Sequence, residues 1–154
     1  MLTLTKIFRF EMAHAIQGYP GACKNIHGHS YELHVSFAAA INETSFIPAP
    51  GFIIDFKDIK KLVREVVIQR FDHNLLLSAD FIAANPTLPA MDNLVIFDAE
   101  PTAENMLLYI KMILQKNLPA GIQLVYLKLF ETTDSYAEWT DNSRLVNQQG
   151  PVSA

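Results

Sequence analysis

Residues 27–39 constrain the fold most strongly, because apolar and polar side chains alternate along them. The apolar set is Tyr31, Leu33, Val35 and Phe37, and the polar set is Glu32, His34 and Ser36. This period of two predicts a strand with one buried face. His27 and His29 begin the segment on the apolar parity, so we expect both imidazoles to project from the same face.

A third histidine lies at the end of another predicted strand, at residues 3–14. The residues that share one parity there are Leu4, Phe8, Phe10, Met12 and His14. We expect the two strands to pair antiparallel across the loop at 15–26, which contains glycine and proline. His14, His27 and His29 could then form a three-histidine metal site. Three protein ligands leave an open coordination position, which is typical of catalytic zinc.

The remaining segments predict an α+β fold with an antiparallel sheet and two helices on one face. The expected elements are a short strand at 52–54, a helix from Asp55 to about Phe71, irregular chain at 78–93, a short strand at 94–97, a helix capped by Thr102 that ends at Pro119–Gly121, and a strand at 122–131. The last strand is apolar on both faces, so it is central or faces another subunit. We expect a single domain over residues 1–154.

Composition excludes several classes of function. Of the 154 residues, 12 are Lys or Arg and 16 are Asp or Glu, giving a net charge of −4 without a basic run, which argues against nucleic acid as a partner. We expect no membrane span and no signal peptide. The single cysteine predicts a cytoplasmic location. With 50% hydrophobic residues, some apolar surface is expected to be buried between subunits of a homo-oligomer.

Two residues near the histidine pair each allow a simple structural interpretation. Lone cysteines are usually inert and buried, but Cys23 lies in the loop four residues before His27. A metal dication and Lys24 nearby would favour its thiolate, which could act as a base or a nucleophile. His34 falls on the polar parity, and we interpret it as a solvated strand residue.

Two acidic positions also leave alternatives open. Asp72-His73 follows a helix end, where the helix dipole favours a histidine; the same pair could instead move protons. Glu131 ends an apolar strand face, where a carboxylate must find hydrogen-bond donors. It is either a surface residue past the strand or an anchor for the N–H groups of a flat heterocycle.

Taken together, the motifs of the chain resemble the 6-pyruvoyl tetrahydropterin synthase / 6-carboxytetrahydropterin synthase family. The resemblance extends over nearly all of residues 5–140. The matching segments are Phe10-x-x-Ala13-His14, Cys23–Tyr31 (CKNIHGHSY), Gly51–Phe56 (GFIIDF), Phe71-Asp72-His73-Asn74-x-Leu76, Pro101–Asn105 (PTAEN), Glu131-Thr132 and Ala137-Glu138-Trp139. Each segment is only moderately specific, but their order is highly specific. Residues 78–98 are longer than the usual link in compact bacterial members.

The resemblance implies a tunnelling fold whose subunits join their sheets into a barrel, as a trimer or hexamer with active sites at subunit boundaries. It assigns Zn²⁺ to His14, His27 and His29, and proton transfer to Cys23, Asp72 and His73. It also assigns pterin binding to Glu131, with Thr102 and Glu104 beside the pocket. The implied substrate is a small molecule, 7,8-dihydroneopterin triphosphate.

The family has branches that differ in product. One branch releases only the triphosphate and forms 6-pyruvoyl tetrahydropterin. Another also cleaves the side chain, giving 6-carboxy-5,6,7,8-tetrahydropterin and acetaldehyde. The three residues between Cys23 and His27 resemble the short spacing of the carboxy branch. A folate-precursor branch with a Glu near the Cys position is disfavoured, since residues 22–26 contain none. A non-catalytic pterin- or purine-binding module with structural zinc is the alternative from another class.

Overall fold

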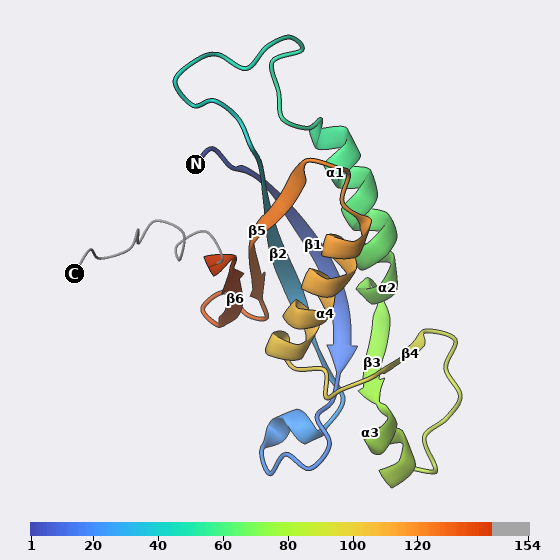
Figure 1. Ribbon diagram of the computed structural model, residues 1–154. Helices are drawn as coiled ribbons and strands as arrows, with labels where there is room; N and C mark the ends of the chain where they lie inside the picture. The colour runs from blue at the N-terminus through green and yellow to red at the C-terminus, as the bar shows by residue number, and fades with distance from the viewer. Residues whose placement is uncertain (143–154) are drawn as a thin grey trace, which may run out of the picture.

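The computed structural model describes residues 1–142 and contains a mixed six-stranded sheet with the strand order β4-β3-β1-β2-β5-β6 (Figure 1). The strands are β1 (Leu4–His14), β2 (His27–Ala39), β3 (Asn74–Ser78), β4 (Leu94–Phe97), β5 (Ile122–Phe130) and β6 (Tyr136–Thr140). The helices are α1 (Phe56–Val63), α2 (Gln69–Phe71), α3 (Ala79–Ala84) and α4 (Ala103–Asn117), with a π-helical turn at Arg64–Ile68 and a 3-10 turn at Ala22–Lys24.

β1 and β2 form the antiparallel pair that the sequence predicts. Their register places His14 opposite His27 and Met12 opposite His29. Residues directly opposite one another in such a pair project from the same face, with Cβ atoms about 5 Å apart. The register therefore brings the three histidines to one end of the sheet on the parity of the buried residues.

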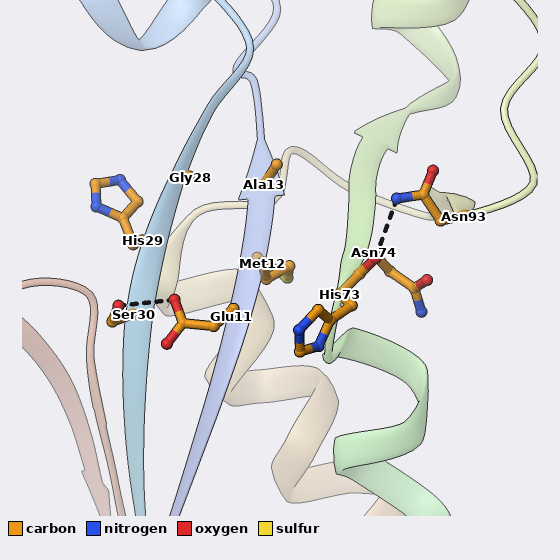
Figure 2. Close-up of a pocket in the computed structure, with 9 residues that line it drawn as sticks. All are labelled: Glu11, Met12, Ala13, Gly28, His29, Ser30, His73, Asn74 and Asn93. Carbon is orange, nitrogen blue, oxygen red and sulfur yellow. Dashed lines mark hydrogen bonds between the residues drawn. The ribbon is translucent and has the colours of Figure 1, made fainter.

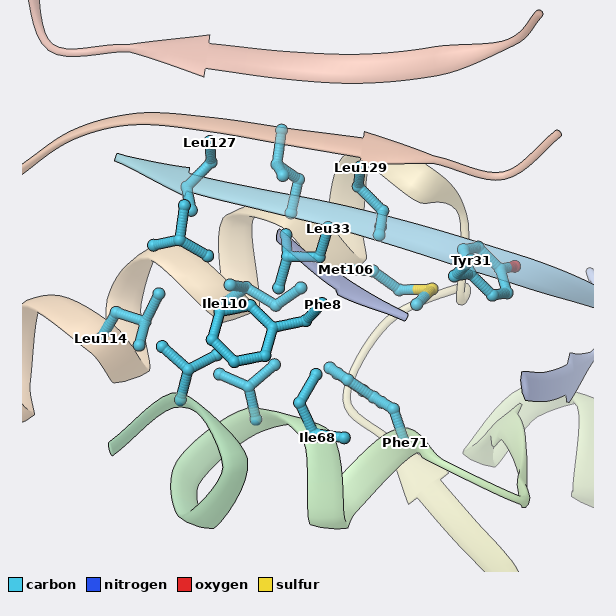
Figure 3. Packing of buried hydrophobic residues seen from close by; sticks show 14 of the residues in the cluster. Phe8, Tyr31, Leu33, Ile68, Phe71, Met106, Ile110, Leu114, Leu127 and Leu129 are labelled. Carbon is cyan, nitrogen blue, oxygen red and sulfur yellow. The ribbon is translucent and has the colours of Figure 1, made fainter. Parts of the chain in front are cut away.

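The main hydrophobic core lies between one face of the sheet and the layer of helices α1–α2 and α4 that covers it (Figures 1 and 3). Alternate residues of β1, β2 and β5 provide the sheet side, and the fully buried side chains include Tyr31, Leu33, Ile110, Leu114 and Leu127. The alternation predicted for β2 is thus confirmed, because its apolar parity faces these helices.

Both predicted helices begin at their expected caps. The Asp55 carboxylate accepts a hydrogen bond from the Lys57 amide, and the Thr102 hydroxyl accepts one from the Asn105 amide at 3.3 Å. The first helical segment ends at Phe71 as expected, although a π-helical turn interrupts it. The second ends at Asn117, shortly before the predicted stop.

The prediction of a wholly antiparallel sheet is wrong at one edge. Residues 74–78 form β3, which pairs parallel with β1, and β4 pairs parallel with β3. The run Leu75-Leu76-Leu77 has no clear period, so the pairing of β3 depends on strands distant in sequence. The short helix α3 also occupies part of the segment expected to be irregular. Ser78 caps it by accepting a hydrogen bond from the Phe81 amide.

α3 packs on the side of β3 opposite the main core. Phe81 of α3 contacts a small cluster with Leu75, Leu77 and Ala15, whereas Leu76 belongs to the main core. The expected strand at 52–54 is wrong: the chain bends at residues 53–54 before Asp55, and the Phe52 side chain is half exposed. The expected last strand is β5, and β6 adds a further edge strand beyond it. Within residues 1–142, no helix has the length and apolar character needed to cross a membrane.

Candidate metal centre and adjoining pockets

The rings of His14, His27 and His29 lie together at the end of the β1–β2 pair. Ring centroids are 4.6 Å apart for His14 and His27, 4.9 Å for His27 and His29, and 5.3 Å for His14 and His29. One ligand nitrogen from each ring lies within 4.8 Å of the other two. His14 is buried, whereas the other two rings are partly exposed. The three side chains could therefore hold a metal ion.

Two of the three rings are oriented by backbone carbonyls. His14 Nδ1 lies 2.7 Å from the Pro101 carbonyl oxygen, and His27 Nδ1 lies 2.8 Å from that of Asn25. In each case the Nδ1–H donates to the carbonyl, so the Nε2 lone pair is left for a metal. Such a second hydrogen bond fixes the tautomer of a metal-binding imidazole and raises its basicity as a ligand.

The donor set fits a metal that prefers nitrogen ligands. Burial lowers the pKa of His14 below its ordinary value, and the Pro101 carbonyl and Glu131 only partly oppose this effect. His14 is therefore neutral at pH 7, which is the protonation state that binds metal.

Glu131 lies beside this cluster, directly after β5. One carboxylate oxygen is 3.4 Å from His14 Nε2 and 3.9 Å from His29 Nε2. The same oxygen accepts a hydrogen bond from the Tyr31 hydroxyl at 3.3 Å. Burial, followed by the nearby Glu131 charge, raises the pKa of Tyr31, so this phenol remains a donor. A molecule bound at the histidines would therefore meet the Glu131 carboxylate.

Most of the predicted site residues share one cavity of about 310 Å³. It is lined by His14, Cys23, Thr102, Glu104 and Glu131, among others. Cys23 lies in the 3-10 turn between β1 and β2 and is partly exposed. Its carbonyl accepts a hydrogen bond from the Ile16 amide at 2.9 Å, which ties the turn to the end of β1. The cavity thus combines a partly exposed cysteine, two carboxylates and one ring of the candidate metal centre.

His73 lines a different cavity, and Asp72 lies next to it in the chain. This second cavity of about 320 Å³ is lined by His73 with Glu11, Ser30 and Asn93, and also by His29 of the histidine cluster (Figure 2). The Nδ1 of His73 lies 2.9 Å from the Asp72 carboxylate, and the ring is 79% exposed. Within the described chain, the predicted proton-transfer set is therefore divided: Cys23 and His73 line separate cavities.

Several groups that position these side chains were not predicted from the sequence. They are Tyr31, the backbone carbonyls of Asn25 and Pro101, and the Glu11 and Asn93 contacts of Asp72-His73. Tyr31 shares the parity of His27 and His29, which was an available signal. The two carbonyls carry no sequence signal, because every residue has one.

Comparisons with known proteins agree with this geometry. The sequence matches the family described as 6-pyruvoyl tetrahydropterin synthase over residues 3–142. It is 31% identical over 142 residues to a 6-carboxy-5,6,7,8-tetrahydropterin synthase of Rickettsia typhi, covering 90% of this chain and 99% of that protein. The enzyme of the same name from Haemophilus influenzae is 37% identical over 73 residues, which span 47% of this chain and half of that protein.

A solved structure supports the fold assignment. The 6-pyruvoyl tetrahydropterin synthase of Caenorhabditis elegans superimposes with a TM-score of 0.64, over 90% of this chain and 94% of that one. The two sequences are 20% identical. The fold of the single chain expected from the sequence is therefore confirmed, whereas the assembly of subunits into a barrel stays a prediction.

Proposed function

Since the chain belongs to the 6-pyruvoyl tetrahydropterin synthase family, we propose that it is a zinc-dependent carbon–carbon lyase. The proposed reaction converts 7,8-dihydroneopterin triphosphate and one water molecule to 6-carboxy-5,6,7,8-tetrahydropterin, acetaldehyde and triphosphate. The observation that carries the proposal is the cavity in which His14, Cys23 and Glu131 meet, beside the rings of His27 and His29. The product would feed the formation of 7-deazapurines such as queuosine.

Each residue of this cavity has a distinct role in the proposed reaction. His14, His27 and His29 would hold the metal. Zinc, when bound, supplies Lewis-acid polarisation of the substrate side-chain hydroxyls. Cys23, as thiolate, removes a proton from that side chain. Glu131 accepts hydrogen bonds from the amino and ring N–H groups of the pterin, while Thr102 and Glu104 border the pocket.

Asp72 and His73 supply the second proton-transfer group. Asp72 fixes the His73 ring by its contact with Nδ1, which leaves Nε2 to exchange a proton with the substrate. Because Cys23 and His73 line separate cavities of one chain, we place the complete active site at a boundary between subunits of a trimer or hexamer. The 79% exposure of the His73 ring supports this placement, since such a ring can approach a neighbouring subunit.

The proposal also covers the whole chain and its location. We treat residues 1–154 as one catalytic domain, of which 143–154 lie outside the described residues. A cytoplasmic location is proposed from the single cysteine. The carboxy product is favoured over 6-pyruvoyl tetrahydropterin by the short Cys23–His27 spacing and supported by the names of the Rickettsia and Haemophilus relatives.

Product analysis tests the proposed reaction. Zinc-loaded protein is incubated with 7,8-dihydroneopterin triphosphate, and acetaldehyde, triphosphate and pterins are quantified. We expect acetaldehyde and 6-carboxytetrahydropterin in equal amounts. Triphosphate release without acetaldehyde would instead identify the pyruvoyl reaction. Tight pterin binding without any product would identify a binding module and contradict the enzymatic proposal.

A further inference from the structure

We propose that Asn93 is a positioning residue that holds the backbone of His73 in the orientation needed for proton transfer. This inference rests on the proposed function of His73. Asn93 belongs to the segment at 78–98 whose length exceeds the usual link in compact bacterial relatives, and for which the sequence suggested no definite role. Its side-chain amide donates a hydrogen bond to the His73 carbonyl oxygen at 3.0 Å (Figure 2).

His73 has an uncommon backbone conformation. Its φ is +60°. Within residues 1–142, it is the only residue other than glycine whose φ is positive. An L-residue in this left-handed region is disfavoured and persists only where its surroundings fix it. Since the His73 ring is 79% exposed, packing of the ring contributes little to that fixation. Hydrogen bonds to the backbone are therefore the main contacts that fix the conformation of His73.

Two hydrogen bonds from Glu11 of β1 hold the Asp72-His73 pair, and a third contact lies within the pair. The His73 amide donates to the Glu11 carbonyl oxygen at 2.6 Å, and the Glu11 amide donates to the Asp72 carboxylate at 3.1 Å. The Asp72 carboxylate in turn contacts His73 Nδ1. These contacts fix the amide side of His73 and its ring, but they leave the carbonyl side to another group.

Asn93 provides the contact on the carbonyl side. Its own carbonyl accepts a hydrogen bond from the Leu75 amide at 2.9 Å, and the next residue begins the parallel pairing of β4 with β3. The segment between α3 and β4 also contributes Leu88 and Met91 to the cluster around Phe81. Asn93 is thus carried by a packed part of the chain, so its amide can fix the peptide that follows His73.

The test compares Asn93→Asp with Asn85→Ala in the zinc-loaded protein. Asn93→Asp keeps the side-chain shape but loses the donor to the His73 carbonyl. Asn85 is the matched control, because its amide donates to the Phe81 carbonyl at 2.8 Å in the same segment.

We expect Asn93→Asp to lower kcat roughly 10-fold with little change in KM, since misplacement of a reacting group mainly reduces turnover. Amide hydrogen exchange at His73 should also become faster in Asn93→Asp. Asn85→Ala should leave kcat and the His73 exchange rate unchanged. Asn93→Ala should reproduce the effect without introducing a charge.

A double-mutant cycle with His73→Ala separates positioning from a general loss of stability. If Asn93 acts through His73, Asn93→Ala has no further effect on kcat in the His73→Ala background. An equal loss in both backgrounds, or unchanged exchange and kcat in Asn93→Ala, would overturn the inference. A wild-type protein without turnover would contradict the proposed function instead; the exchange rate at His73 would then still decide whether Asn93 holds this backbone.

Discussion

At the scale of single residues, the candidate metal centre is set by the bonds that orient its rings. His14 and His27 each direct Nδ1 to a backbone carbonyl, so Nε2 of both rings is the atom left for a metal. His34 has different surroundings. It lies on the face of β2 opposite to His27 and His29, and its Nε2 is 2.7 Å from the Glu32 carboxylate. Two histidines of one strand thus have different chemistry because they face different sides of the sheet.

This difference predicts the effect of two alanine substitutions on metal content. His27→Ala should reduce bound zinc from about one ion per chain to near zero, since a site with two imidazoles lacks the usual minimum of three protein ligands. His34→Ala is the matched control and should retain the metal. Elemental analysis after dialysis measures both. Equal metal in the two variants would exclude His27 from the ligand set.

The pKa of His14 predicts a pH dependence in the metal-free protein. Burial lowers the pKa of His14 in the folded state below its ordinary 6.5, so around that pH the unfolded chain binds more protons. The contribution of His14 to stability is therefore present above pH 6.5 and is lost as pH falls through the folded-state pKa. Urea unfolding in the presence of EDTA at pH 7.5 and pH 5 measures the difference. In His14→Gln, the free energy of unfolding should differ less between the two pH values. If the difference stays the same as in the wild type, groups other than His14 cause the pH dependence.

At the scale of secondary structure, two elements from distant parts of the chain meet at the metal centre. The β1–β2 register supplies the three rings, whereas the Pro101 carbonyl that orients His14 comes from the residue before the cap of α4. Thr102 therefore has two structural consequences: it ends the loop that carries Pro101, and it begins the helix that covers the core.

The Thr102 cap can be tested by a pair of substitutions. Thr102→Ala removes the acceptor of the Asn105 amide and should lower the free energy of unfolding by about 1 kcal/mol. Thr102→Ser keeps the hydroxyl and should stay close to wild type. Chemical denaturation of the metal-free proteins measures both values. Equal losses in the two variants would indicate that packing of the threonine methyl group, rather than the cap, is responsible.

At the scale of the whole molecule, the proposed proton-transfer set is divided between two cavities. Cys23 lies in the cavity with Glu131, whereas His73 lies in the cavity with Glu11 and Asn93. The sheet ends at the edge strands β4 and β6, which can extend it into a second subunit. A shared active site would then use the thiol of one subunit and the partner subunit's His73.

A shared active site predicts complementation between two variants of low activity. Cys23→Ala and His73→Ala should each keep the fold and the metal but retain only a small, measurable fraction of the wild-type turnover. After unfolding and refolding of an equal mixture, about a quarter of the sites should combine both intact residues, because subunits assemble at random in a symmetric oligomer. Activity assays of the refolded mixture and of each variant refolded alone measure this recovery. A mixture of correctly assembled oligomers with no more turnover than the variants alone would place both residues in one subunit.

The sequence alone determined the local parts of the fold and much of the candidate site. The alternation in β2 fixed which face is buried, and the parity of His14, His27 and His29 followed from it, because the period of a strand is two. The helix caps at Asp55 and Thr102 could also be predicted, since capping depends on residues within one helical turn. The motif order was sufficient to identify the family.

Only the tertiary structure decided the features that depend on contacts between distant segments. The parallel pairing of β3 with β1, the backbone carbonyls that orient two imidazoles, and the Asn93 contact to His73 join residues with no shared local pattern. The division of Cys23 and His73 between two cavities has the same origin. A pattern of side chains determines which face of an element is buried, but the position of a backbone carbonyl or a strand partner depends on how the whole chain packs.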